Sequence, residues 1–184
     1  MATRLSFVAC AHPGCLLLLI GVISIYLPEA HTRAVDFWCN VQVRQKMLER
    51  IDSKAGGGCS DVLPSPVQLP CVGINVAEWR NKTLQQKHAE VLEALQLFQH
   101  GVQHVRNQTS LKCLERLERS ITDHVNIVSN VLVQNDDLTY PHQPAEMCPN
   151  KTSPSEVVTA YKRLLNGKLN RLAMDLKHTV CKAK

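Results

Sequence analysis

Aromatic residues are scarce in this sequence: phenylalanine, tryptophan and tyrosine together make up 4% of its 184 residues. So low a content argues against a β-sandwich, because strands are enriched in aromatic side chains. It also argues against a surface on which nucleic-acid bases stack. Leucine and valine at helical spacing are left to supply the core.

The usual signatures of catalytic and metal sites are also missing. The sequence has no glycine-rich phosphate loop, no G-x-S-x-G, no H-E-x-x-H and no C-x-x-C pair. His100 and His104 lie four residues apart and could share a metal ion, but no third ligand follows at a suitable spacing. We therefore expect no catalytic residue, no metal and no cofactor.

The charges of the chain are mixed rather than segregated. The formal net charge is +5, and basic residues alternate with acidic ones instead of forming a continuous basic stripe. A nucleic-acid partner is therefore not expected.

An apolar run near the N-terminus, Leu16–Leu27, is about a dozen residues long, whereas a membrane-spanning helix needs roughly 20. Its length fits a secretory signal peptide with cleavage after Ala30 or Ala34. We predict that residues 1–34 are the signal and residues 35–184 the mature domain. The mature chain is then secreted and extracellular, without membrane insertion. The alternative is an uncleaved N-terminal anchor.

The cysteine content agrees with an oxidising compartment. Two of the eight cysteines, Cys10 and Cys15, lie in the signal segment. An even number then remains, which favours disulfides, although six cysteines allow 15 connectivities. The remaining cysteines are Cys39, Cys59, Cys71, Cys113, Cys148 and Cys181. Three Asn-x-Thr sequons, at Asn81, Asn107 and Asn150, predict N-glycosylation.

Four segments show helical periodicity, over residues 36–55, 84–105, 111–133 and 153–181. Their apolar stripes are, in chain order, Phe37, Val41, Leu48 and Ile51; Leu84, His88, Val91, Leu95, Phe98, Val102 and Val105; Leu114, Leu117, Ile121, Val125 and Val128; and Val157, Tyr161, Leu164, Leu165, Leu172 and Leu176. The last segment opens with a predicted capping box between Ser153 and Glu156, with Pro154 at the first helical position.

The connections between these segments differ in length. The second and third segments are joined by about five residues, whereas the other two connections, 56–76 and 134–153, are long. A short link makes neighbouring helices antiparallel, and a long one can carry the chain along the bundle so that the next helix runs parallel. The sequence predicts an all-α, four-helix bundle with the up-up-down-down topology of long-chain cytokines and two long crossover loops.

The fourth segment carries a polar face opposite its apolar stripe. At i, i+3, i+4, i+7 and i+8 stand Arg163, Asn166, Gly167, Asn170 and Arg171, with Lys168 at the border. Glycine inside a helix costs about 1 kcal/mol relative to alanine. Gly167 therefore indicates either close approach by a partner or packing against the first crossover.

Three sets of residues together resemble the erythropoietin/thrombopoietin family of four-helix cytokines. The first is Leu164–Leu169 (LLNGKL), and the second is the strap Ser65–Pro70, followed by the tripeptide Glu78-Trp79-Arg80. The third is the four-cysteine frame Cys39, Cys59, Cys113 and Cys181. The strap and the frame are closer to the thrombopoietin branch.

The resemblance implies a monomeric haematopoietic cytokine that binds and dimerises a cell-surface receptor. A thrombopoietin-like hormone would act on the megakaryocyte or thrombocyte lineage, and an erythropoietin-like hormone on red-cell precursors. An alternative from another class is a secreted helical carrier of an apolar ligand.

Carried over residue by residue, the resemblance implies two receptor contacts. The stronger one uses Lys168, Gly167 and Asn166 in the last helix, Lys46 and Asn40 at the start of the first helix, and Pro66, Val67 and Leu69 in the strap. The weaker one uses Gln42 and Asn126, where thrombopoietin carries arginines. Of all these, Lys168 is the residue we expect to contribute most.

The resemblance also implies the disulfides Cys39–Cys181 and Cys59–Cys113. Cys71 and Cys148 are additional to the family frame, and we expect them to pair with each other and join the two crossovers.

Overall fold

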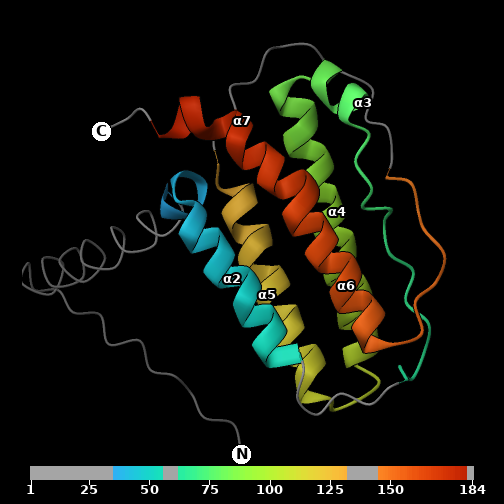
Figure 1. Ribbon diagram of the computed structural model, residues 1–184. Coiled ribbons are helices and arrows are strands. Elements are labelled where there is room, and N and C mark those ends of the chain that lie inside the picture. Colours follow the sequence, from blue (N-terminus) through green and yellow to red (C-terminus); the bar gives the residue numbers. More distant parts are fainter. Residues whose placement is uncertain (1–34, 56–61, 132–144, 182–184) are drawn as a thin grey trace, which may run out of the picture.

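The computed structural model describes residues 35–55, 62–131 and 145–181 (Figure 1). A helical turn at residues 35–39 precedes the named helices. These are α2 (Val41–Ala55), α3 (Val76–Asn81), α4 (Leu84–Arg106), α5 (Lys112–Ser129), α6 (Pro154–Leu164), the π-helical turn η1 (Leu165–Leu169) and α7 (Asn170–Val180). The last three follow one another without a break and form one long helix. The predicted all-α four-helix class is confirmed.

Contacts between the ends of the helices set their directions. Cys39, just before α2, is bonded to Cys181 at the end of α7, so α2 is antiparallel to the last helix. Lys87, near the start of α4, pairs with Asp175 of α7, so α4 is antiparallel to the last helix as well. Figure 1 accordingly shows α2 and α4 running one way and α5, α6 and α7 the other.

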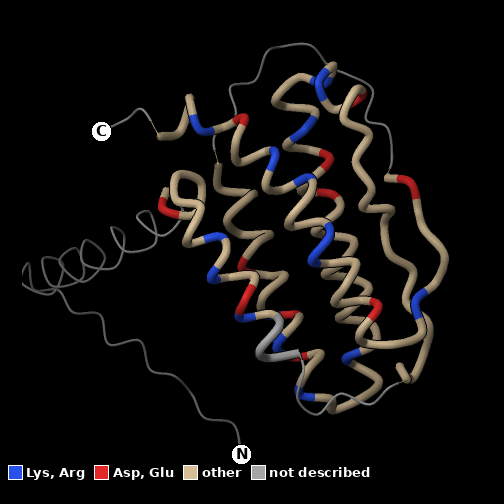
Figure 2. Tube along the Cα trace, in the orientation of Figure 1, with Lys and Arg blue, Asp and Glu red and all other residues tan. Residues whose placement is uncertain are grey.

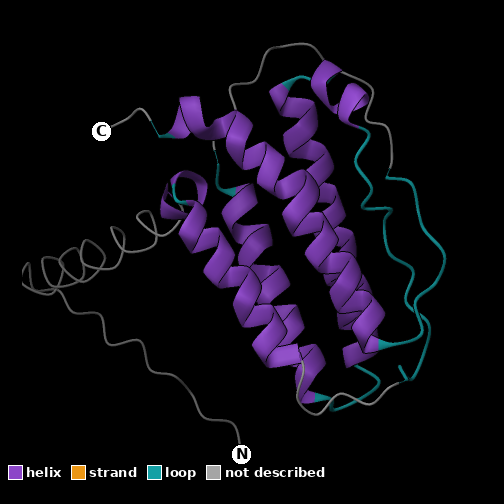
Figure 3. Cartoon of the chain, viewed as in Figure 1, coloured by secondary structure: helices purple, strands orange, loops and turns teal. Residues whose placement is uncertain are grey.

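The two crossovers lie side by side along one edge of the bundle (Figure 3). Val67 and Lys151 exchange two backbone hydrogen bonds, both of 2.8 Å, in an antiparallel bridge. The Cys71–Cys148 disulfide joins the same two segments. The crossovers therefore hold each other as well as the helices.

The disulfides Cys39–Cys181 and Cys71–Cys148 are confirmed. Cys113 is disulfide-bonded too. Its predicted partner, Cys59, lies outside the described residues.

The core is built from the predicted stripes of α4 and of the last helix. In α4 the side chains of Val91, Leu95, Phe98, Val102 and Val105 are all 1% exposed or less. Every predicted stripe residue of the last helix is likewise buried. The capping box between Ser153 and Glu156 is also present as predicted.

The predicted stripe of the first helix is wrong at Val41, which is 53% exposed. The reason is a break at Asn40, where the first turn ends and α2 begins. The Asn40 side chain accepts a hydrogen bond of 2.9 Å from the backbone N–H of Gln42 and so caps α2. The break shifts the helical phase, so Trp38 is buried in place of Val41.

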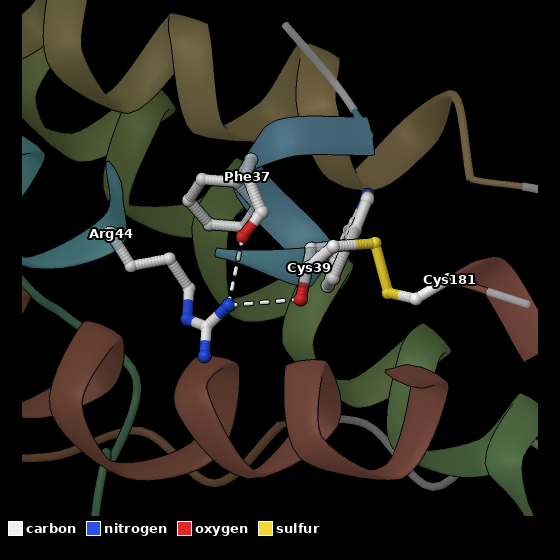
Figure 4. Close-up of a disulfide and its surroundings, with 5 residues drawn as sticks. Phe37, Cys39, Arg44 and Cys181 are labelled. Carbon is white, nitrogen blue, oxygen red and sulfur yellow. Dashed lines mark hydrogen bonds between the residues drawn. A yellow bond between two sulfur atoms is a disulfide. The ribbon is translucent and has the colours of Figure 1, made fainter. Parts of the chain in front are cut away.

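Arg44 holds this break together and is buried, with 8% exposure (Figure 4). Its Nη1 donates to the carbonyl oxygens of Phe37 and Trp38 at 2.8 and 2.9 Å. Its Nε also donates to Asn170 of α7 at 3.4 Å. The side chain thus binds carbonyl groups that the helix break frees, and burial lowers the pKa of its guanidinium.

Two further expectations differ from the structure. The third helix, α5, ends at Ser129 rather than near residue 133, because Asn130 caps it by donating from Nδ2 to the Asn126 carbonyl. The helix α3 was not predicted. The residue that marks the start of α3 in the sequence is Asn75, whose side chain accepts hydrogen bonds from the backbone N–H groups of Ala77 and Glu78.

His124 of α5 is buried, at 2% exposure, although its imidazole can carry a charge. Its Nδ1 lies 2.7 Å from the Ser120 carbonyl and 2.8 Å from the Tyr161 hydroxyl. Phe37 packs edge-on against its ring. Three helical segments therefore meet at this imidazole, and its burial lowers the pKa of His124 below the ordinary 6.5.

This burial predicts a loss of stability at mildly acidic pH. Below the ordinary pKa of 6.5 the unfolded chain takes up a proton on His124 that the folded chain does not. The free energy of unfolding must therefore decrease as the pH falls from there toward the lowered pKa. We expect the melting temperature of His124→Gln to depend less on pH than that of the wild type between about pH 7.5 and 5.5. The exposed His100→Gln is the control, and equal pH dependence in wild type and His124→Gln would contradict this account.

Candidate functional site

The polar face of the last helix is interrupted by the π-helical turn η1. A π turn closes i→i+5 hydrogen bonds and so adds one residue, a rotation of roughly 100° relative to an α-helix. Arg163 and Asn166 are exposed, whereas Asn170 and Arg171 are half-buried. Asn170 bonds Arg44 of α2 instead of facing solvent. The exposed polar face of the last helix is therefore shorter than the α-helical spacing of its residues predicts.

Gly167 lies in the middle of this π turn. A Cβ added at Gly167 would meet no atom within 4 Å, so packing against the first crossover does not require glycine here. Close approach by a partner, the other explanation offered by the sequence, stays a prediction. The glycine that lies against the first crossover is Gly101 of α4, where an added Cβ would lie 3.0 Å from Val67 Cγ1 and would displace that side chain by a few tenths of an ångström.

Lys168 is held inside the fold rather than presented to solvent. Its side chain is 12% exposed, and its Nζ lies 2.7 Å from Glu90 Oε1 of α4. The same Nζ donates to the Cys71 carbonyl of the first crossover at 3.4 Å. Lys168 thus ties the last helix to both α4 and the crossover. A receptor would have to break this pair to use its charge.

Glu90 is the centre of a small ionic cluster. It accepts from Lys82 at 2.8 Å as well as from Lys168, and Lys82 also pairs with Glu78. Burial alone would raise the pKa of the Glu90 carboxyl, but the hydrogen bonds from the two lysines outweigh it and lower that pKa. Glu90 therefore stays ionised and holds both ammonium groups.

The start of the first helix lies beside the π turn. A small hollow between the two is lined by Val41 and Gln45 of α2 and by Leu165 and Asn166 of η1, among others. Lys46 and Gln42 are exposed on α2, and Asn40 is exposed while it caps that helix. The structure therefore brings the exposed part of the last helix next to the first helix, as the resemblance implied.

The strap residues divide into two groups. Pro66 is exposed, but Val67 and Leu69 are only 3% and 1% exposed. Both side chains pack toward Gly101 of α4. Both side chains therefore hold the strap against α4, and the receptor-contact role that the resemblance implies for Val67 and Leu69 stays a prediction.

A second hollow lies between α2 and α5, and sequence reasoning missed it. Met47, Ile51 and Leu117 form its apolar part, and it is also lined by Arg50, Arg116 and Arg119, among others. The exposed Asn126 stands farther along α5. The sequence signal that could have indicated this hollow is the i, i+3 spacing of Arg116 and Arg119, which alternate with acidic residues. Figure 2 shows both signs of charge interspersed on these helices.

The tripeptide Glu78-Trp79-Arg80 forms part of α3 and anchors it. Trp79 is 4% exposed, and its Nε1 donates to Asp175 of α7 at 3.2 Å. Lys87 lies over the indole ring and pairs with the same carboxylate. This motif fixes α3 between α4 and α7.

Asn81, Asn107 and Asn150 are all exposed, as glycan attachment requires. In the described ranges no group of three or more His, Cys, Asp or Glu side chains is arranged to hold a metal ion. Nor is any helix within those ranges long and apolar enough to cross a membrane.

A model of the family described as "Erythropoietin/thrombopoietin" matches residues 36–184. The chain belongs to the erythropoietin/thrombopoietin family. This is a family of cytokines, which are hormones and not enzymes.

Curated relatives of this erythropoietin/thrombopoietin chain are thrombopoietins. It is 27% identical to the dog protein (Canis lupus familiaris) over 147 residues, which cover 78% of this chain and 41% of the relative. It is 30% identical to the rat protein (Rattus norvegicus) over 118 residues, 63% of this chain and 36% of the relative. The mouse protein (Mus musculus) is 29% identical over 125 residues, 67% and 35%. The chain thus aligns with about two fifths or less of these relatives.

The ion pair of Lys168 with Glu90 makes a prediction about stability. We expect Lys168→Met to lower the free energy of unfolding by about 1–2 kcal/mol, because it leaves a half-buried carboxylate without one of its partners. Lys177→Met, at an exposed lysine of α7, is the control and should change little. Denaturant unfolding of Lys168→Met, Glu90→Gln and the double variant measures the coupling between the two. Strictly additive effects would show that the pair contributes nothing.

Proposed function

We propose that the chain is a secreted, thrombopoietin-like cytokine that binds and dimerises a cell-surface cytokine receptor. The observation that carries the proposal is the open π turn of the last helix. There Asn166 is exposed, and Gly167 has free space where a side chain would be. Family membership supports the hormone over the carrier of an apolar ligand, and the curated relatives support a thrombopoietin-like rather than an erythropoietin-like hormone.

The main receptor contact in this proposal combines two neighbouring surfaces. The last helix contributes Arg163, Asn166 and Gly167, and Arg171 lies at its margin. The start of α2 contributes Lys46. Lys168 is engaged with Glu90 inside the fold. We therefore expect it to stabilise the position of this surface rather than to contribute the most binding energy. Interface energy concentrates in a few residues, and the exposed polar residues beside Gly167 are the best placed ones.

Dimerisation requires a second contact on another part of the hormone. The face between α2 and α5 is separate from the π turn and carries the exposed Gln42 and Asn126. The hollow lined by Arg50, Arg116 and Arg119 belongs to the same pair of helices. We propose that this face makes the weaker receptor contact, and that together the two contacts drive growth of the megakaryocyte or thrombocyte lineage.

Gly167→Ala tests the proposed main contact. Alanine favours a helix by about 1 kcal/mol over glycine, and its Cβ would meet no atom, so the melting temperature should stay the same or rise. Receptor binding should weaken at least about fivefold, because a methyl group would stand in a closely packed interface. Surface plasmon resonance on the immobilised thrombopoietin receptor ectodomain measures this, with the erythropoietin receptor ectodomain in parallel.

Gly73→Ala is the matched control, since its Cβ would also meet no atom within 4 Å. It should bind as the wild type does. Preferential binding of the wild type to the erythropoietin receptor would replace the thrombopoietin-like assignment. Unchanged binding by Gly167→Ala would remove the π turn from the interface.

Secretion can be tested separately. The proposal predicts that animal cells expressing the full chain release it into the medium with a new N-terminus near residues 31–35. The released protein should lose mass on treatment with a peptide N-glycosidase, because the sequons at Asn81, Asn107 and Asn150 are exposed. N-terminal sequencing and mass spectrometry measure both. Retention of the whole chain in cell membranes would instead support the uncleaved anchor.

A further inference from the structure

The imidazole of His124 lies where three parts of the bundle meet. Its side chain is 2% exposed. Phe37 of the first turn packs edge-on against the ring, with 5.7 Å between the ring centroids. Tyr161 of α6 packs edge-on as well, with 5.9 Å between centroids. A change of charge on this ring therefore acts on the first turn, on α5 and on the last helix at once.

The contacts of the ring fix where its protons stand. Nδ1 lies 2.7 Å from the Ser120 carbonyl oxygen and 2.8 Å from the Tyr161 hydroxyl oxygen. The Tyr161 hydroxyl donates to the same carbonyl at 3.0 Å. A carbonyl oxygen can only accept a hydrogen bond, so Nδ1 carries the proton of the neutral ring. A second proton must therefore enter at Nε2, away from both of these partners.

The groups around the ring give a positive charge little support. Burial lowers the pKa of His124 and outweighs the Ser120 carbonyl and the charge of Asp123, which both raise that pKa. Tyr161 faces the ring uncharged, because burial raises the pKa of its hydroxyl. The charged group that α2 contributes to the same hollow is Arg44, which is itself positive. Protonated His124 therefore depends on water for stabilisation.

The hollow between α2 and η1 is the place where water can reach the ring at least cost. His124 lines it together with Gln45 of α2 and Asn166 of η1, among others. None of its lining residues in the described part of the chain is acidic. Because the two walls of the hollow are already incompletely packed against each other, moving them apart loses few contacts.

The first turn is tethered on both sides, which limits how far this opening can go. The Cys39–Cys181 disulfide joins its end to the end of α7. Arg44 binds the carbonyl oxygens of Phe37 and Trp38, as Figure 4 shows for the first of them. The turn and the start of α2 can therefore shift together without leaving the bundle, and they can return at neutral pH.

We propose that His124 is an acid switch: its protonation loosens the junction between α2 and the π turn and thereby weakens receptor binding in acidic compartments of the cell. The inference rests on the proposed receptor function, since Asn166 and the start of α2 belong to the proposed main contact. A binding surface must be held within about 0.5 Å of its productive geometry, so a small separation is sufficient. His124 is buried and is a positioning residue for this contact.

The first experiment measures receptor binding at two pH values. Wild type, His124→Gln and His124→Leu are bound to the immobilised thrombopoietin receptor ectodomain at about pH 7.4 and 5.5. We expect the wild type to lose at least about fivefold more affinity over this range than either variant, mainly through faster dissociation. The receptor is the same throughout, so titration of its own groups cancels in the comparison. If glutamine prevents folding, the leucine variant keeps the comparison valid.

His88→Gln is the matched control. His88 is a half-buried histidine of α4 whose Nε2 contacts the Val128 carbonyl, and it is not among the residues that line the hollow. This variant should keep the full pH dependence of the wild type. Equal pH dependence in the wild type and the His124 variants would overturn the proposal. Loss of the pH dependence in His88→Gln alone would overturn it too.

The second experiment locates the movement by amide hydrogen exchange of the hormone alone. Wild type and His124→Gln are compared at the same pH, so that the intrinsic exchange chemistry is equal. At about pH 5.5 we expect faster exchange in the wild type at residues 36–45 and 165–170, with little difference at residues 91–98 of α4, and no difference at about pH 7.4. Faster exchange spread evenly over the chain would show a merely structural effect of His124 and would overturn the switch.

The two experiments separate this inference from the function on which it rests. Binding that is equally tight at both pH values would leave the proposed function intact and overturn the switch. Failure of the wild-type chain to bind any receptor ectodomain of the family at neutral pH would overturn both.

Discussion

The antiparallel pairing of the two crossovers is the constraint on which the rest of the structure depends. The first crossover must run the length of the bundle for α4 to be parallel to α2, and the second must do so for the last helix to be parallel to α5. A single extended segment over a helical surface has no protein partner for most of its backbone groups, and those on its buried side would be unsatisfied. Here the segments satisfy each other between Val67 and Lys151, and the Cys71–Cys148 disulfide fixes their register.

Ion pairs and hydrogen bonds of charged side chains help to hold the last helix in place. Lys168 reaches α4 and the first crossover, and Asp175 binds both Trp79 and Lys87. These groups are occupied within the fold, so the polar surface left for a partner is smaller than the sequence indicates. It is concentrated around Arg163 and Asn166, where the π turn opens the helix. π turns inside α-helices are frequent at functional sites.

The helical class, the stripes of α4 and the last helix, and the capping box at Ser153 followed from periodicity and local chemistry. The helix break at Asn40 did not, because it depends on Arg44, which lies four residues on and binds carbonyls that only the fold brings near. The burial of His124 was missed for a similar reason: its partner, Tyr161, lies on another helix.

The candidate site was predictable in outline and not in detail. The spacing of polar residues in the last helix located the exposed Arg163 and Asn166, but an α-helical spacing carries no sign of the π turn that rotates Asn170 toward α2. The glycine motif drew attention to Gly167, while the glycine that lies against the strap, Gly101, stands alone in an ordinary helical stretch. The charge of Lys168 was visible in the sequence, but its partner, Glu90, is distant in the chain.

Amide hydrogen exchange of the hormone, with and without the receptor ectodomain, tests the central claim most directly. The claim is that the π turn and the start of α2 beside it form one receptor-binding surface. The account predicts slower exchange on receptor binding at residues 163–169 and 41–46, with α3 (Val76–Asn81) unchanged. Slower exchange at α3 and the outer side of α4, with no change at the π turn, would contradict it.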